Sequence, residues 1–214
     1  MNFKYYKTER LIILILILTF LITPLSSLIE ETISRNKDLN TLYSYVGIFS
    51  TISILTFLLF LINQYLWKLK LLKWLVNIPN LNGRYEGELV STFIDTSTNL
   101  PIVKKCVIEV YQTASKIKIY SYHGDLHTQQ QTSQANSVSE EIVEQSNGFF
   151  EIFYIYSNAA NALEIQLNNH LGTCGLKYFP DIKLLEGEYY NQRGLKGTIK
   201  VKFVQSKLLG RLTQ

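Results

Sequence analysis

Aromatic and polar side chains occur together at three places in the second half of this 214-residue chain. The three clusters are Tyr154-x-Tyr156-x-Asn158, His170-x-Gly172-Thr173 and Tyr189-Tyr190-Asn191-x-Arg193. Tyrosine rings can stack on nucleobases, while guanidinium, amide and hydroxyl groups bind phosphate oxygens or base edges. In a second interpretation the tyrosines are core and wall residues, and Asn and Arg cap turns. The candidate ligand-binding residues are Tyr154, Tyr156, Asn158, His170, Thr173, Tyr190, Asn191 and Arg193.

No enzyme signature accompanies these clusters. His123-x-x-x-His127 has a spacing seen in metal sites, but we expect the pair in a polar loop without a nearby cysteine or a suitably placed acid. The chain has no G-x-S-x-G elbow and no phosphate-binding loop. Cys174 fits a packed strand position better than a nucleophile, and with Cys106 as the only other cysteine we expect two reduced thiols. The sequence therefore predicts a protein that is not an enzyme, with no catalytic residues and no metal site.

The clusters lie in a region where apolar and polar residues alternate, which is the pattern of strands with one buried face. Alternation predicts strands over residues 81–89, 103–112, 116–122, 149–157, 163–169, 184–190 and 198–204, and a further strand over 174–179 is plausible. One helix is predicted over 137–145, because Ala135, Val138 and Ile142 fall on one side of it. The three glutamines at 129–131 predict a mobile loop.

About eight short antiparallel strands with polar outer faces suggest a closed barrel or a sandwich. The glycines inside the predicted strands favour the barrel, since such glycines commonly mark sharp bends; they are Gly83, Gly87, Gly187 and Gly197. The predicted fold class is thus an all-β C-terminal domain formed by an antiparallel barrel. A barrel of this size is either filled by its own side chains or holds one small ligand.

Two apolar runs without ionised side chains precede this region, at residues 11–28 and 45–66. About 20 apolar residues in a helix cross a bilayer, so we expect a transmembrane hairpin with spans at about 11–29 and 45–66. Cleavage of the first run as a signal peptide is disfavoured by its length and by the absence of a small-residue cleavage motif. A pair of buried helices in a soluble protein would normally show a polar face, and neither run has one.

Charge gives the expected topology. Basic residues precede the first span and follow the second, so both termini are predicted in the cytoplasm of a protein with two spans. The whole net charge of +4 lies within residues 1–73, and the remainder carries 13 basic and 13 acidic residues. A neutral soluble domain is a poor candidate for binding long nucleic acid. The expected domains are a transmembrane hairpin with a basic interfacial segment at 1–78, a cytosolic barrel at 80–206 and a tail at 207–214.

The order of these parts resembles a known family. Two N-terminal spans, a small β domain, and the stretches HLGTCGL at 170–176 and LEGEYYNQRGLKGTIKVKF at 185–203 are similar to the membrane-anchored β-barrel effectors of CBASS. CBASS systems are bacterial anti-phage systems built on cGAS-like nucleotidyltransferases. The resemblance implies a bacterial inner-membrane protein whose barrel binds a cyclic dinucleotide, whose copies oligomerise, and whose hairpin disrupts the membrane and causes cell death. It implies no cofactor besides this activating ligand.

Two other functions fit the residues alone. A membrane-anchored adaptor would have a filled barrel and would dock a protein partner on its outer face. A lipid-binding barrel would have an apolar lumen that opens toward the membrane. The presence and the chemistry of an internal cavity distinguish these functions from a receptor for a nucleotide.

Overall fold

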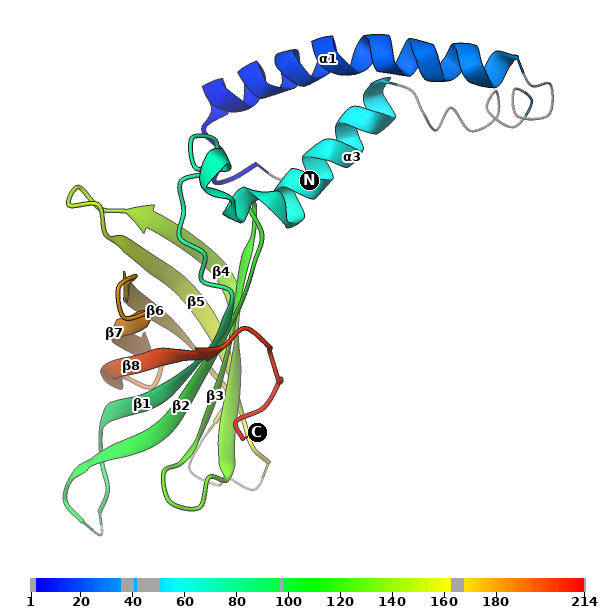
Figure 1. Ribbon diagram of the computed structural model, residues 1–214. Helices are drawn as coiled ribbons and strands as arrows, with labels where there is room; N and C mark the ends of the chain where they lie inside the picture. Colours follow the sequence, from blue (N-terminus) through cyan, green and yellow to red (C-terminus); the bar gives the residue numbers. More distant parts are fainter. Residues whose placement is uncertain (1–2, 36–40, 42–50, 97, 163–167, 214) are drawn as a thin grey trace. The chain divides into compact units, whose positions relative to one another are not determined.

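The structure is a computed structural model that describes residues 3–35, 41, 51–96, 98–162 and 168–213 (Figure 1). The chain forms two compact units. The first comprises Met1–Asn77 together with Thr113–Lys116, and the second comprises Ile78–Gln112 and Ile117–Gln214. The helices among the described residues belong to the first unit, and the eight described strands belong to the second.

Among its described residues, the first unit contains one helix that is long and apolar enough to cross a membrane. This helix, α1 (Thr8–Ser34), has 27 residues, a mean hydropathy of 2.7 over its most apolar window and little buried surface. At 1.5 Å per residue, it exceeds the roughly 30 Å of a bilayer core. The first expected span, at 11–29, lies within α1.

The second expected span, at 45–66, is only partly within the described residues, because 45–50 lie outside them. Its described part forms α3 (Thr51–Gln64), whose 14 residues are fewer than a bilayer requires. Two short 3-10 turns follow, Leu66–Lys68 and Lys70–Leu72. The described residues therefore support one spanning helix.

Asn63 is a buried polar residue near the end of α3. Its side-chain Oδ1 accepts a hydrogen bond of 2.5 Å from the Ser115 hydroxyl, and its backbone carbonyl accepts one of 3.0 Å from the Ala114 N–H. Segment Thr113–Lys116 belongs to the first unit through contacts of this kind. An asparagine inside an apolar helix is thus satisfied by a specific partner, as buried amides require.

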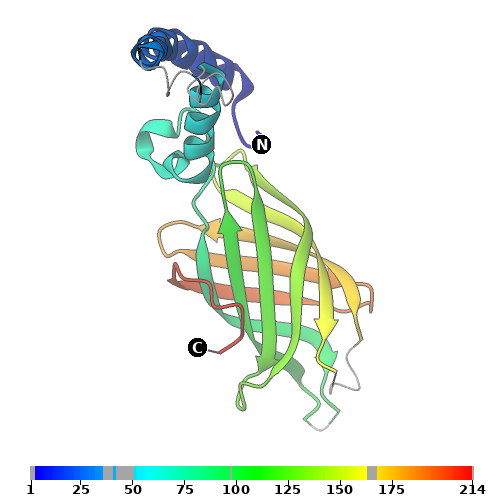
Figure 2. The ribbon, with the colours of Figure 1, turned by 90° about the vertical axis from the view of Figure 1, so that its right-hand side faces the viewer.

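The second unit is a closed antiparallel barrel of eight strands, each paired with the next and β8 with β1 (Figures 1 and 2). The strands are β1 (Gly83–Ile94), β2 (Pro101–Gln112), β3 (Ile117–Asp125), β4 (Gln131–Glu144), β5 (Phe150–Ala160), β6 (His170–Phe179), β7 (Leu184–Asn191) and β8 (Lys196–Gln205). The predicted barrel is confirmed. Because the eight described strands close into a barrel, none of them is an exposed edge that could pair with another chain and aggregate.

The lumen is filled at its centre by large apolar side chains. Residues with 0–2% exposure include Tyr85, Ile108, Ile119, Ile152, Leu176 and Leu185. They alternate along their strands with outward-facing residues, as the period of two requires. At Gly187 a β-carbon would collide with the backbone of Gly175 on β6, so glycine is needed where β6 and β7 approach closely.

Two predicted elements differ from the structure. The helix expected at 137–145 is wrong, because residues 137–144 belong to β4, and Gln131 of the expected mobile loop is the first residue of that strand. The inward residues of this strand before the bulge are small or polar, namely Ser133, Ala135 and Ser137, and the bulge between Ser137 and Ser139 shifts the alternation. The strand expected at 163–169 falls largely on 163–167, outside the described residues, and β6 begins at His170.

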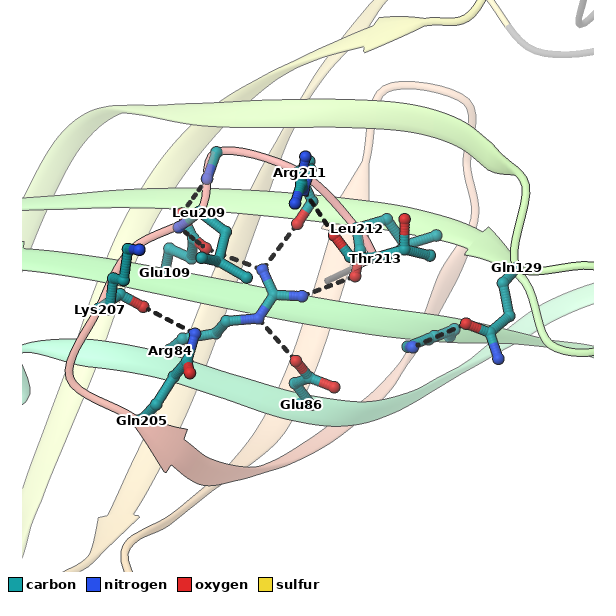
Figure 3. A network of polar contacts seen from close by, with 12 residues as sticks. Arg84, Glu86, Glu109, Gln129, Gln205, Lys207, Leu209, Arg211, Leu212 and Thr213 are labelled. Carbon is teal, nitrogen blue, oxygen red and sulfur yellow. Dashed lines mark hydrogen bonds and ion pairs between the residues drawn. The ribbon is translucent and has the colours of Figure 1, made fainter.

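The segment after β8 crosses the outer face of β1, β2 and β3 and covers an ion pair there (Figures 2 and 3). Arg84 donates to the carbonyl oxygens of Arg211 and Leu212, both at 2.6 Å. Glu109 accepts hydrogen bonds from the backbone N–H groups of Leu209 at 2.8 Å and Gly210 at 3.0 Å. We call residues 209–212 the outer strap. Its residues lie in the part of the chain for which the sequence predicted only a tail.

Leu212 attaches the outer strap to the barrel through its side chain. It is 1% exposed and packs with Val107 of β2 and Tyr122 of β3. A β-carbon at Gly124 would collide with the Leu212 side chain, so the glycine leaves room for it. The strap is therefore held by main-chain hydrogen bonds and by one buried leucine.

Candidate functional site

A cavity of about 210 Å³ lies inside the barrel, at the end where the odd-numbered strands finish and the even-numbered strands begin. Its apolar and hydroxyl lining comprises Leu89, Ser91, Phe93, Ile102, Ser121, Ser133, Leu195 and Ile199. Its ionisable, aromatic and amide lining comprises Lys104, His123, Tyr154, Tyr156, Asn158, His170, Tyr189, Asn191 and Arg193. The barrel is thus only partly filled, and it retains room for part of a ligand.

The charge around this cavity is of one sign. Lys104, His123, His170 and Arg193 line it, and none of the described residues that line it is a carboxylate. In a partly enclosed site of low dielectric, such a lining favours an anion. The arrangement is unlike the outside of the barrel, where Lys200 is paired with Glu186.

Three tyrosines form an aromatic wall. The ring of Tyr156 lies 6.3 Å from the ring of Tyr154 and 6.4 Å from that of His170, centroid to centroid. It also covers Gly172 on the neighbouring strand, where a β-carbon would collide with it. Burial raises the pKa of Tyr154, Tyr156 and Tyr189, so all three hydroxyls stay protonated and can donate hydrogen bonds.

Lys104 and His123 are connected through Thr132. The Lys104 ammonium donates to Thr132 Oγ1 at 3.0 Å, and this hydroxyl donates to the backbone carbonyl of His123 at 3.2 Å. The pKa of His123 is lowered to about 4, first because burial disfavours the charged ring and then because Lys104 and His170 are positive neighbours. His123 is therefore neutral at physiological pH.

Two polar atoms in the cavity wall are buried without a hydrogen-bond partner. They are Nδ1 of His123 and Nδ2 of Asn158. Asn158 is 4% exposed and lies directly across the β5–β6 pairing from His170. Buried polar groups are nearly always paired, so a cluster of exceptions indicates a place for a polar ligand.

The two cysteines lie beside the aromatic wall. Both are buried and free, as expected for packed strand residues. Burial raises the pKa of the Cys174 thiol to about 12, and that of Cys106 also rises. Thiols that stay protonated are poor nucleophiles. Among the described residues, no group of three or more His, Cys, Asp or Glu is placed to hold a metal ion.

The structure brings six of the eight candidate ligand-binding residues to the cavity. Those six are Tyr154, Tyr156, Asn158, His170, Asn191 and Arg193. Thr173 and Tyr190 instead face an outer groove between β4 and β7, because each is one residue away from an inward-facing position. This groove also carries Glu141, Glu151, Glu186 and Glu188, which makes it unsuited to an anion.

Sequence reasoning missed Lys104 and His123. The predicted strand at 116–122 ended one residue before His123, which was assigned to a loop, whereas β3 extends to Asp125 and points His123 into the cavity. Lys104 was not recognised as a site residue, because it is one of two adjacent lysines on β2 and only one of the two points inward. The signal that identifies it is the alternation of β2, in which Ile102, Lys104 and Cys106 share the inner face.

A closed eight-stranded barrel with a basic and aromatic cavity has the architecture of a small-ligand-binding barrel, and its lining suits an anionic ligand. Comparison with known proteins agrees. The family profile described as "Cap15, cyclic dinucleotide receptor domain" matches residues 76–203, which is more than half of the chain, so the chain belongs to this family. The curated CD-NTase-associated protein 15 of Yersinia aleksiciae is 26% identical over 131 residues. That similarity covers 60% of this chain and 56% of the relative's length.

Proposed function

We propose that this protein is an effector of a CBASS anti-phage system, whose barrel binds a cyclic dinucleotide made by a cognate nucleotidyltransferase. The observation that carries the proposal is the cavity lined by tyrosines and four basic residues, with no carboxylate among its described lining residues. Tyrosines suit the bases and the basic residues suit two phosphodiesters. Membership in a family described as a cyclic dinucleotide receptor domain supports the same ligand.

The cavity also suggests how such a ligand sits. Its volume of about 210 Å³ is below the roughly 300–1,000 Å³ of typical ligand pockets. A cyclic dinucleotide carries two nucleosides, so we expect one base to enter the cavity against Tyr156, while the rest of the ring lies toward its mouth near Arg193. An apolar lipid would place hydrocarbon against the charged Lys104 and Arg193 and the polar His123, and is a poorer fit.

The remaining part of the proposal concerns the membrane. Helix α1 is the anchor, and the run at 45–66 completes a hairpin in the bacterial inner membrane with both termini in the cytoplasm. Ligand binding then favours an oligomer whose hairpins disrupt the bilayer. Moving the equilibrium from 1:99 to 99:1 requires about 5.5 kcal/mol of preference for the assembled state, part of which the raised effective concentration of tethered copies supplies.

The test is calorimetric titration of the full chain in lipid nanodiscs with cyclic di-AMP, cyclic di-GMP, mixed cyclic dinucleotides and cyclic trinucleotides. We expect saturable binding of at least one cyclic dinucleotide, and no comparable binding of linear dinucleotides or of oleate. Binding of oleate alone would support the lipid-binding barrel. Failure of every nucleotide against a folded barrel would contradict the proposal.

A further inference from the structure

We propose that Lys104, His123 and Asn158 form a phosphodiester subsite of the cavity, and that His123 takes up one proton from solvent when the ligand binds. This inference rests on the proposed function, because it concerns the same cavity. It adds a chemical property, proton-linked affinity, that the family relationship does not supply.

The three residues reach one region of the cavity from three strands. Thr132 ties the Lys104 ammonium to the backbone of His123, and the charges of Lys104 and His170 are both felt at the His123 ring. Asn158 is the cross-strand partner of His170. An ammonium, an imidazole and an amide therefore surround the same space.

The unpartnered atoms specify what this space is suited to bind. Asn158 Nδ2 is a donor, and His123 Nδ1 is a second nitrogen that becomes a donor when the ring is protonated. With the Lys104 ammonium, these groups offer several N–H donors to the acceptor oxygens of a phosphodiester.

The charges around His123 explain why its ring is neutral without ligand and why ligand binding favours the protonated ring. Lys104 and Cys106 face it from β2, His170 from β6, and Tyr154 and Tyr156 from β5, while β4 contributes the uncharged Ser133. Arg193 lines the same cavity. All of these groups are positive or neutral, so a phosphodiester adds the negative charge that makes imidazolium favourable.

When the ligand binds, one solvent proton binds the free imidazole nitrogen of His123, the phosphodiester keeps its single negative charge, and no bond of the ligand changes. If the pKa of His123 rises in the complex to its ordinary value of about 6.5, affinity increases by about tenfold between pH 7.5 and pH 5.5. A fixed ammonium such as Lys104 produces no such dependence in this range.

The experiment is calorimetry of the full chain in nanodiscs at pH 6.0, in MES and in Bis-Tris, with whichever of cyclic di-AMP, cyclic di-GMP or a mixed cyclic dinucleotide binds. The two buffers differ in ionisation enthalpy, so the difference in observed heat reports the protons taken up. We expect uptake of more than about half a proton for the wild type. His123→Gln keeps a polar side chain and should bind without uptake, whereas His127→Gln, at an exposed turn, should keep it.

The outcomes separate this inference from the proposed function. Tight binding by the wild type without proton uptake overturns the subsite and leaves the receptor intact. If the His123→Gln variant still takes up a proton, the proton binds another group, such as His170, and the subsite inference is also overturned. Absence of binding by every cyclic dinucleotide overturns the receptor and the subsite together. The wild-type measurement needs no variant, and a pH titration of the imidazole ¹⁵N shifts with and without ligand gives the same answer should His123→Gln fail to fold.

Discussion

Arg84 and Glu109 form an ion pair on the outer face of the barrel, with 2.8 Å between Nη1 and Oε1, and their side chains are 0% and 2% exposed. Arg84 also pairs with Glu86 at 2.6 Å, and the outer strap satisfies the remaining hydrogen-bonding groups (Figure 3). Removing Glu109 would leave the buried Arg84 guanidinium with Glu86 as a counter-charge but without its buried partner, so the loss exceeds what a surface ion pair contributes. The strap and the pair therefore depend on each other.

Glu109→Gln should lower the free energy of unfolding by about 1.5–3 kcal/mol, because the buried Arg84 would lose one of its two carboxylate partners and keep Glu86. Chemical denaturation of the barrel measures this loss. Glu88→Gln, at an exposed position of β1, is the matched control and should change stability by less than about 0.5 kcal/mol. Equal effects of the two substitutions would show that the pair is not buried in solution.

Leu212→Ala should also destabilise the barrel, by about 2–5 kcal/mol, because a fully buried leucine leaves a cavity between Val107 and Tyr122. Amide exchange should become faster across the outer strap, at Leu209 and Gly210, whose N–H groups bind Glu109. Leu171→Ala, at a leucine with 43% exposure on β6, provides the comparison. Unchanged exchange in the strap would show that Leu212 does not hold it.

Without ligand, His123 should make the protein less stable in acid. Its pKa is lowered to about 4 in the folded state against about 6.5 when unfolded, so the unfolded chain binds the proton more readily between these values. Stability from this group is complete above about pH 6.5 and declines as the pH falls toward 4, by about 3 kcal/mol at most. Denaturation of wild type and His123→Gln across pH 4–7 measures the difference, and parallel curves would refute it.

Tyr156→Leu should weaken binding of the cyclic dinucleotide, because the ring provides a stacking surface inside the cavity. One base–aromatic stack contributes about 1–3 kcal/mol, so the dissociation constant should rise between about fivefold and 150-fold. Tyr190→Leu is the control, since this tyrosine faces the outer groove and is 51% exposed. A larger loss at Tyr190 than at Tyr156 would place the ligand outside the barrel.

Much of the fold followed from the alternation of apolar and polar residues. Strands such as β1 and β5 have strong alternation, and the barrel could be predicted from this alternation together with the glycines inside the strands. Strand β4 could not, because its inner face carries Ser133, Ala135 and Ser137, and a bulge interrupts its period. Of these three residues, Ser133 lines the cavity, so part of the property that hid the strand belongs to the site.

The site was predictable only in part, because inward and outward residues of a strand cannot be separated without its register. Tyr189 and Tyr190 look equivalent in sequence, yet one lines the cavity and the other the outer groove. The outer strap was invisible, since its hydrogen bonds come from the backbone of residues 209–212 and carry no side-chain signature. Contacts between distant segments determine both features.

Lys104 and Lys105 offer the most direct test of the central claim, that the ligand binds inside the barrel. They are neighbours on β2, but Lys104 lines the cavity, while Lys105 lies on the outer face and reaches Gln129 at 3.4 Å. The measurement is the affinity of the full chain for its cyclic dinucleotide after Lys104→Met and after Lys105→Met.

Loss of a charge-assisted hydrogen bond is worth about 1.5–3 kcal/mol, so Lys104→Met should weaken binding by about tenfold to 150-fold. Lys105→Met should leave binding within about twofold of the wild type, because its charge lies outside the site. Equal affinities of the two variants, or a loss confined to Lys105→Met, would contradict a ligand site within the barrel.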